Sequence, residues 1–317
     1  MSCFSIIYSI NRNFEICGIF KLIGLLCLMT FIEAERKFID GLSTIYGSEE
    51  AKSLSWLSIS FVCKLERAKY LSIKQEEINP DATDQLFKIH EKLIQGIPLQ
   101  YILGETEFYD LTIKVNPSVL IPRPETEELV DWALITSRLI NGEIEVLKLL
   151  DIGTGSGCIP ISIKKYIPLA DITAIDISEA ALNTARQNAD LNQIEINFIQ
   201  DDIFNLSNLE LINTKYDLIL SNPPYVTESE KDQMLDNVLN HEPHNALFVP
   251  DNDPLVFYRA IADFALVHLK INGFLFLELN EKFGQETLNL LKEKGFKEIE
   301  LRQDMLGKDR MIKAVLS

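Results

Sequence analysis

Cysteine and histidine are scarce in this chain of 317 residues, and their spacing excludes the usual metal and disulfide motifs. The five cysteines include no CxxC pair, and their odd number does not suit a disulfide framework. A reduced, cytoplasmic compartment is therefore the simplest interpretation. The cysteines are Cys3, Cys17, Cys27, Cys63 and Cys158. Among four histidines, His241 and His244 are close, but Pro243 disrupts the helix that a helical metal motif needs. We expect two loop histidines and no metal site.

Positive charge is also scarce. Lys and Arg total 30 against 47 Asp and Glu, which gives a formal net charge of −17. Such a protein repels polyphosphate and anionic surfaces, so we expect neither a direct nucleic-acid partner nor a membrane partner. Hydrophobic residues make up 47% and charged residues 24%, which excludes wholesale disorder and fibrous classes. The length fits two domains, or one large domain with an appendage.

The N-terminus carries an apolar run that is too short to span a membrane. Leu22–Ile32 has the length of a signal-peptide core, but a spanning helix needs about 20 apolar residues. No small-x-small cleavage site follows it. Three interpretations stay open: a weak signal or anchor, a buried amphipathic helix, or an upstream stretch foreign to the natural protein. We favour a start near Met29, with residues 1–28 as an apolar N-terminal extension.

The next part of the chain has helical periodicity. Between Phe31 and Gly96, apolar residues recur at spacings of three and four, and the single proline is Pro80. This pattern predicts a small helical bundle with a loop near Pro80. Nothing in it carries chemistry, so we expect residues 29–105 to form a domain for substrate recognition or support.

A short segment of strand periodicity follows. In Phe108–Ile121, Leu111, Ile113 and Val115 alternate on one face, and Asn116–Pro117 predicts a turn. We interpret residues 106–122 as a β-hairpin linker. Residues 123–317 then form the larger domain, which begins with helical spacing over Glu125–Ile140.

After Asn141, strands and helices alternate, which predicts an α/β fold with a mostly parallel sheet wrapped by helices. Ligands of such sheets bind at the carboxyl ends of the strands. Strands are predicted at 145–152, 172–177, 194–199, 216–221 and 273–279, with closing strands at Ile299 and 311–315. Helices are predicted at 159–166, 178–191, 255–269 and 283–294.

A glycine loop, DIGTGSGC from Asp151 to Cys158, leaves the first strand and opens a helix. Its spacing is G-x-G-x-G rather than G-x-G-x-x-G, with an acid two residues ahead. This pattern resembles the S-adenosylmethionine loop of Rossmann-like methyltransferases. Glycines allow a ligand to approach the backbone closely. The negative charge of Asp151 suits a ligand with an ammonium and a sulfonium.

The ends of the next two strands supply acids in the matching order. Asp176 ends the second strand, where an acid can accept hydrogen bonds from both ribose hydroxyls. It could instead cap the following helix, although Ser178 can do that. Asp201 and Asp202 follow the third strand, where an acid can reach an adenine amino group, or they are turn residues. The candidate cofactor-binding residues are Asp151, Gly153, Thr154, Gly155, Ser156, Gly157, Asp176, Asp202, Ile203 and Asn222.

The fourth strand ends in Asn222-Pro223-Pro224-Tyr225, where two prolines lock the chain. NPPY at this site is the signature of methyltransferases that act on a planar nitrogen; a stiff exit loop is the alternative. The Asn222 amide oxygen and the Pro223 carbonyl can accept both protons of an NH2 group, and Tyr225 can pack against its plane. This arrangement aims the nitrogen lone pair at the methyl carbon. These four residues are the candidate catalytic and substrate-binding residues.

From about Met29 onward, the chain resembles the peptide chain release factor glutamine methyltransferases. The segment IPRPETE, ahead of DIGTGSG, is the most specific part, because generic adenine methyltransferases lack it. The motifs that carry the resemblance are LQYILG (99–104), Phe108-Tyr109, LIPRPETE (120–127), 151–157, NPPY (222–225), Glu242-Pro243, Ala246-Leu247, Tyr258-Arg259 and 304–310.

The resemblance implies a helical N-terminal domain, a hairpin linker and a seven-stranded, Rossmann-like domain that uses S-adenosyl-L-methionine. It further implies methylation of the side-chain amide nitrogen, N5, of the glutamine in the Gly-Gly-Gln loop of translation release factors. We expect a monomer acting on this protein substrate.

Two other classes of protein compete with this interpretation. NPPY also serves adenine N6, so a nucleic-acid methyltransferase is the alternative, but the net charge and the lack of a Lys- and Arg-rich recognition domain speak against it. A catalytically idle cofactor-binding protein is expected to lose NPPY, which is intact.

Overall fold

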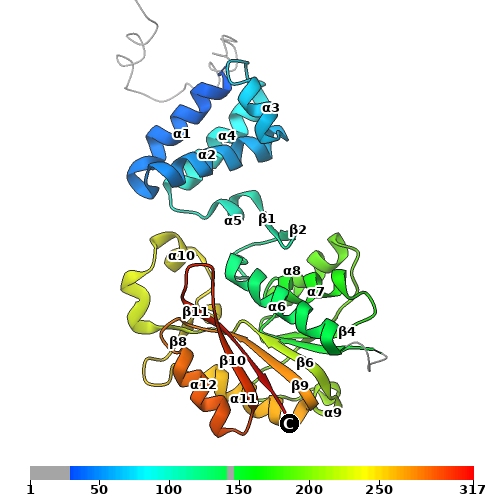
Figure 1. Cartoon of the computed structure of the whole chain (residues 1–317). Coiled ribbons are helices and arrows are strands. Elements are labelled where there is room, and N and C mark those ends of the chain that lie inside the picture. Colours follow the sequence, from blue (N-terminus) through cyan, green and yellow to red (C-terminus); the bar gives the residue numbers. More distant parts are fainter. Residues whose placement is uncertain (1–28, 141–145) are drawn as a thin grey trace, which may run out of the picture. The chain divides into compact units, whose positions relative to one another are not determined.

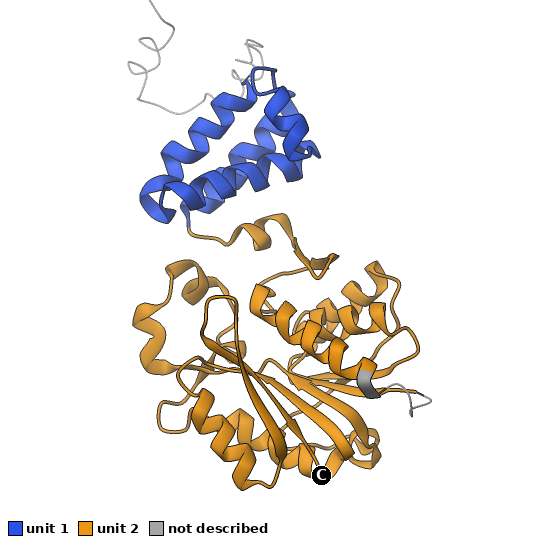
Figure 2. Ribbon diagram, viewed as in Figure 1, with its two compact units in different colours: residues 1–95 blue, residues 96–317 orange. Residues whose placement is uncertain are grey.

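The structure, a computed structural model, describes residues 29–140 and 146–317 (Figure 1). The apolar extension of residues 1–28, and with it the predicted start near Met29, lies outside the described residues. The chain divides into two compact units, Met1–Gln95 and Gly96–Ser317 (Figure 2). The second unit therefore includes the segment predicted as a hairpin linker as well as the sheet.

The first unit consists of helices, as its periodicity predicts. They are α1 (Phe31–Tyr46), α2 (Ser48–Cys63), α3 (Arg67–Ser72) and α4 (Pro80–Ile94). α1 begins at a capping box, in which the Thr30 hydroxyl accepts from the Glu33 N–H and the Glu33 carboxylate accepts from the Thr30 N–H. α4 begins at Asn79, whose side chain accepts from the Ala82 N–H, with Pro80 at the first helical position.

Most of the apolar residues that recur at spacings of three and four form the core of this bundle. Phe38, Leu42, Leu54, Ile59, Leu86, Ile89 and Leu93 are buried. Ile45, Leu57 and Ile94 are not, since they are 49%, 44% and 47% exposed. The spacing thus predicts the helices correctly, but some apolar residues that follow it lie on the surface rather than in the core.

The hairpin forms, but its turn is not where the sequence predicts it. After the short helix α5 (Leu99–Leu103), strands β1 (Glu105–Phe108) and β2 (Leu111–Lys114) pair antiparallel. The turn is Tyr109–Asp110, with φ of 50° and 58°, rather than Asn116–Pro117. Positive φ at both central residues is the geometry that matches the strand twist in a two-residue hairpin. Asn116 instead accepts from the Ser118 N–H with its own side chain, a local turn beyond the hairpin.

The second unit is built on a seven-stranded sheet of order β10-β11-β9-β6-β3-β4-β5. The pairings β5–β4–β3–β6–β9 are parallel, and β11 is antiparallel to β9 and β10. This confirms the predicted α/β, Rossmann-like class. The strands are β3 (Lys148–Ile152), β4 (Asp171–Asp176), β5 (Asn197–Gln200), β6 (Tyr216–Ser221), β9 (Leu269–Glu278), β10 (Lys297–Gln303) and β11 (Asp309–Val315).

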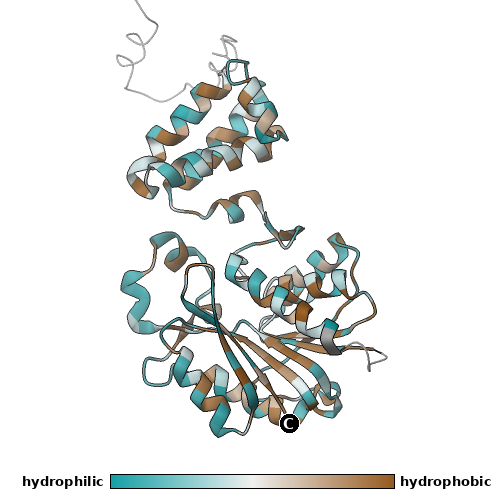
Figure 3. Cartoon of the chain, viewed as in Figure 1, coloured by the Kyte–Doolittle hydropathy of each residue, from teal (hydrophilic) through white to brown (hydrophobic). Residues whose placement is uncertain are grey.

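Helices cover both faces of the sheet, whose strands are largely apolar (Figure 3). Successive strand residues point to opposite faces, so Leu149 joins one core cluster and Leu150 the other. The first cluster includes residues of α6 (Pro124–Ile140), α7 (Cys158–Tyr166) and α8 (Glu179–Leu191). The second includes residues of α11 (Val256–His268) and α12 (Gly284–Glu293).

Several short elements escape sequence prediction because they are too brief for a periodic pattern. They are α9 (Leu209–Asn213), β7 (Val226–Thr227), a 3-10 helix at Glu228–Gln233, α10 (Asp236–His241), a second 3-10 helix at His244–Ala246 and β8 (Phe248–Val249). None of the helices in residues 29–140 and 146–317 combines the length and apolar character needed to cross a bilayer.

One buried amide joins the hairpin to the glycine loop. Asn188 of α8 is fully buried. Its Nδ2 donates to the carbonyls of Lys114 and Ser156, both at 2.9 Å, and its Oδ1 accepts from the Lys114 N–H at 2.6 Å. These three bonds hold the end of β2 and the loop after β3 on the same helix.

Asn188→Asp should destabilise the fold by about 1–3 kcal/mol, because two buried carbonyls lose their donor and face a carboxylate. Urea unfolding of the full chain measures the change. The matched control is Asn183→Asp on the exposed side of the same helix, which should stay within about 0.5 kcal/mol of wild type. Equal effects at both positions would contradict the role given to Asn188.

Candidate active site

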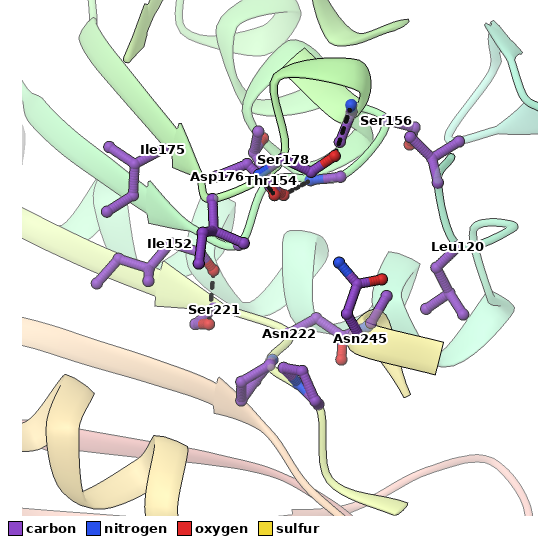
Figure 4. A pocket seen from close by; sticks show the side chains of 18 of the residues that line it. Leu120, Ile152, Thr154, Ser156, Ile175, Asp176, Ser178, Ser221, Asn222 and Asn245 are labelled. Carbon is purple, nitrogen blue, oxygen red and sulfur yellow. Dashed lines mark hydrogen bonds between the residues drawn. The ribbon is translucent and has the colours of Figure 1, made fainter. Parts of the chain in front are cut away.

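A mainly apolar pocket opens at the carboxyl ends of the parallel strands (Figure 4). The strand register brings these ends together, since Ile152 of β3 pairs with Ile175 of β4 on one side and with Ser221 of β6 on the other. The lining residues come from the segment before α6 and its first turn, from the loops after β3, β4, β5 and β6 with the first turns of α7 and α8, from the 3-10 helix at His244–Ala246, and from α11. Among them are Leu120, Arg123, Thr126, Thr154, Asp176, Asp202, Ile203, Asn222, Pro223, Asn245 and Phe257.

The glycine loop takes a backbone shape that side chains disfavour. Gly153 and Gly155 have φ of 74° and 55°, in the left-handed region that glycine adopts freely. The N–H groups of Gly153 and Thr154 both donate to the Ile175 carbonyl at 2.9 Å, which ties the loop to β4. Gly153, Thr154, Gly155 and Ser156 line the pocket, and their contact with a cofactor stays a prediction. Gly157 does not; it packs against α8 instead.

Asp176 ends β4 at the pocket. Its two carboxylate oxygens accept from the N–H groups of Gly155 and Ser178, each at 2.9 Å. Ser178 caps α8, because its hydroxyl accepts from the Ala181 N–H at 3.2 Å. Burial raises the pKa of Asp176 above its ordinary value. The carboxylate is thus held by backbone donors, and its remaining lone pairs are available for the predicted ribose contact.

The two acids after β5 have different surroundings. Asp201 accepts from the N–H groups of Asp202, Ser207 and Asn208. Although burial favours its neutral form, these donors hold the pKa of Asp201 below its ordinary value. Asp201 therefore organises the loop. Asp202, which accepts from the Phe204 N–H at 3.0 Å, stays the candidate for an adenine amino group, with Ile203 beside it in the lining.

Asp151 lies beneath the loop rather than in the lining. It is fully buried, and neither carboxylate oxygen has a partner among the described residues. Burial raises the pKa of Asp151 to about 7. A buried carboxylate without donors is destabilised when ionised, and a nearby cation relieves that cost. This orphaned acid fits the ammonium and sulfonium of S-adenosylmethionine.

The NPPY segment lies directly after β6. Asn222, Pro223 and Pro224 line the pocket, and Figure 4 shows Asn222 and Asn245 across it from Thr154 and Asp176. The Asn222 Nδ2 donates to the Thr126 hydroxyl at 3.1 Å.

Tyr225 is not among the lining residues. Its hydroxyl donates to Glu278 at 3.0 Å, and its ring packs on the second core cluster. The predicted contact of this ring with an acceptor stays a prediction.

Some residues of the site were not identified as functional from the sequence. Thr126 belongs to IPRPETE, a motif with a specific signal but no assigned role. Glu278 closes an apolar strand and carries no signal of its own. Arg123 forms an ion pair with the buried Glu242 at 2.5 Å, and Glu242 also accepts from the Ile121 N–H at 3.3 Å. This pair anchors the segment before α6 to the chain after α10.

The fold and the pocket define a Rossmann-like, S-adenosylmethionine-dependent methyltransferase. Residues 133–249 match a family model described as the methyltransferase small domain, and residues 34–104 match one described as the PrmC N-terminal domain. Among solved structures, the hMettl16 catalytic domain in complex with the MAT2A 3′UTR hairpin 6 is similar in fold, with a TM-score of 0.50 and 18% identity. That match covers 69% of this chain and 80% of that one.

Curated relatives narrow the class to one family. The release factor glutamine methyltransferase of Flavobacterium psychrophilum is 43% identical over 87% of this chain and 96% of its own length. That of Bacteroides thetaiotaomicron is 40% identical over 86% of this chain and 95% of its own. The chain belongs to the release factor glutamine methyltransferase family.

Asp176→Ala should weaken cofactor binding by about 1–3 kcal/mol, the scale of charge-assisted hydrogen bonds left unmade. Calorimetry with S-adenosylhomocysteine measures the affinity. Asp171→Ala is the matched control, because Asp171 begins the same strand and pairs with Lys148 at 3.2 Å at its far end. An unchanged affinity in Asp176→Ala would sink the ribose assignment.

Asp151→Asn should stabilise the cofactor-free protein and weaken cofactor binding. The raised pKa means that the folded state retains a proton that the unfolded state has lost, so Asp151 costs more stability as the pH rises from about 4 to about 7. The gain in melting temperature should therefore be larger at pH 8 than at pH 5. Thermal unfolding at both pH values tests this. Equal gains in melting temperature would show that Asp151 of the folded protein is ionised at pH 5 as well as at pH 8.

Proposed function

We propose that this protein methylates the side-chain amide nitrogen, N5, of the glutamine in the Gly-Gly-Gln loop of translation release factors. The observation that carries the proposal is the position of Asn222, Pro223 and Pro224 in the lining, one strand away from the glycine loop. Family membership supports the substrate, because the curated relatives carry the name release factor glutamine methyltransferase.

The cofactor site is assigned to residues that line or underlie the pocket. Asp176 is the candidate for the ribose, Asp202 and Ile203 for the adenine, and the loop from Gly153 to Ser156 for the backbone contacts. When bound, S-adenosylmethionine supplies a methyl group on a positively charged sulfur.

The chain's own residues overcome the poor nucleophilicity of an amide. The lone pair of an amide nitrogen is delocalised, so the nitrogen must be oriented before it can attack. Asn222 Oδ1 and the Pro223 carbonyl accept its two protons, which favours a pyramidal nitrogen with its lone pair directed at the methyl carbon. The methylated nitrogen, which carries a positive charge once the new N–C bond has formed, then loses one proton to solvent. None of the four histidines lines the pocket, so no histidine base acts there.

Adenine N6 is the less favoured acceptor. Among the described residues that line the pocket, only Arg123 is basic, and it is paired with Glu242. With a net charge of −17, the chain offers little attraction for a nucleic-acid backbone.

The helical unit completes the proposal. Most of this unit matches the model of the PrmC N-terminal domain. Its buried apolar residues form its own core. We assign its surface to recognition of the release factor. We include action as a monomer in this proposal. A cytoplasmic location follows from a substrate that acts in translation.

Asn222→Ala should lower kcat roughly 100-fold to 1000-fold, because losing one oriented acceptor in a dry site costs about 2.7–4 kcal/mol by analogy with oxyanion-hole deletions. Cofactor affinity should change little, since the glycine loop and Asp176 are intact. Mass spectrometry of a release factor incubated with enzyme and isotope-labelled cofactor measures turnover, and calorimetry measures affinity.

Two substrate controls accompany this measurement. A release factor with its loop glutamine changed to glutamate should remain unmethylated. An enzyme that prefers an adenine-bearing oligonucleotide, or an Asn222→Ala enzyme with wild-type turnover, would contradict the proposal.

A further inference from the structure

A chain of hydrogen bonds connects Asn222 to a buried carboxylate on another strand. Asn222 Nδ2 donates to the Thr126 hydroxyl at 3.1 Å, and that hydroxyl donates to Glu278 Oε2 at 2.7 Å. The other carboxylate oxygen of Glu278 accepts from the Tyr225 hydroxyl at 3.0 Å. Thr126 is 2% exposed and Glu278 is 1% exposed. Water therefore does not compete for the bond between Thr126 and Glu278.

The direction of each bond follows from the proton inventory of the groups. A threonine hydroxyl has a single proton, and here that proton goes to the carboxylate. The hydroxyl oxygen can then only accept, so the group of Asn222 that faces it must be the NH2. This leaves Oδ1 as the free acceptor of Asn222, and no described residue donates to it. If the Asn222 amide were reversed, its NH2 group would face the NH2 group of the methyl-accepting glutamine, and two hydrogen-bond donors would face each other.

We propose that Thr126 and Glu278 are positioning residues that fix the orientation of the Asn222 amide, so that its oxygen faces the acceptor nitrogen. The inference rests on the proposed function, because it assigns Asn222 Oδ1 to the glutamine NH2 group. It gives a positioning role to the threonine of IPRPETE and to Glu278, the last residue of β9, which is not among the lining residues. It also makes the choice of an NH2 group over a carboxylate depend on the charge of Glu278.

The surroundings of Glu278 raise the pKa of its carboxyl group above the ordinary value. The pKa of Glu278 is raised to about 6. Burial is the largest cause, and the charge of Glu125 adds to it. The hydrogen bonds from the hydroxyls of Thr126 and Tyr225 and the charge of Arg310 oppose the rise. Tyr258 and the Cys158 thiol also interact with the charge of Glu278. Above about pH 6 the carboxylate accepts from Thr126. Below it, a protonated Glu278 can donate to Thr126, whose hydroxyl is then free to donate to Asn222 and reverse the amide.

Two variants of Thr126 and a control at Thr287 test the hydrogen-bond chain Asn222–Thr126–Glu278, called the relay below. Thr126→Val keeps the shape and removes the hydroxyl, and it should lower kcat roughly 10-fold to 100-fold, the range found when groups that orient metal ligands are removed. The KM for the release factor and the affinity for S-adenosylhomocysteine should change less than about 2-fold, because ground-state binding is retained. Thr126→Ser keeps the hydroxyl and should recover most of kcat. Thr287→Val is the matched control, because Thr287 is also buried but donates to the Phe283 carbonyl within α12.

The pH profile separates the relay from a merely structural role. Wild-type kcat should fall as the pH drops through about 6, because the ionised Glu278 is the active form. Glu278→Gln cannot titrate and Thr126→Val has no hydroxyl to reverse, so both should lose this decline. Melting temperatures of all variants show that each is folded.

The outcomes are distinct. Wild-type kcat in Thr126→Val, an equal loss in Thr287→Val, or an undiminished decline below pH 6 in Glu278→Gln each overturns the relay while the proposed function stands. A wild-type enzyme that leaves the release factor unmethylated overturns the proposed function, and the inference falls with it.

Discussion

The parallel pairing of β3 with β6 is the constraint on which the site depends. Their register places Ile152 beside Ser221, and the Ser221 hydroxyl donates to the Ile152 carbonyl at 2.7 Å, so the two strand ends are linked by a side chain as well as by the ladder. One residue further along each chain, the backbone enters the glycine loop and the NPPY segment. The candidate cofactor loop and the candidate acceptor segment thereby follow adjacent strands, which lie about 4.7–4.9 Å apart in a sheet. A slip of one residue would turn the inward-facing side chains of β6 to the other face of the sheet.

Much of this arrangement can be predicted from the sequence. The alternation of strands and helices predicts the parallel sheet, because each apolar run of β3, β4, β6 and β9 is bounded by a loop. The order of Asp151, Asp176, Asp202 and Asn222 predicts that their strands end at one edge, and the structure places three of these four residues in the lining. Asp151 is the exception. A sequence motif records that an acid precedes the loop but not whether its carboxylate points into the pocket or beneath it.

What the sequence could not predict involves contacts between distant residues and local backbone strain. Thr126 and Glu278 are 152 residues apart in the chain, and no periodicity connects a helix start with a strand end. In the sequence, Glu278 appears only as the polar residue that ends an apolar strand. Nothing there indicates that it accepts hydrogen bonds from Thr126 and Tyr225. The hairpin turn was missed for a different reason. Asn-Pro is a common turn signal, whereas Tyr109 and Asp110 are not a typical pair for a two-residue turn, although they adopt positive φ between strands that pair in register.

The buried Asn188 has a consequence for how the protein responds to its cofactor. One side chain carries bonds to the end of the hairpin and to the glycine loop, so the ordering of either segment restricts the other. Coupling of this kind is reciprocal: whatever free energy a bound cofactor adds to the hairpin, an ordered hairpin returns to cofactor binding. The hairpin end and the glycine loop thus share one buried side chain, although they lie in separate segments of the sequence.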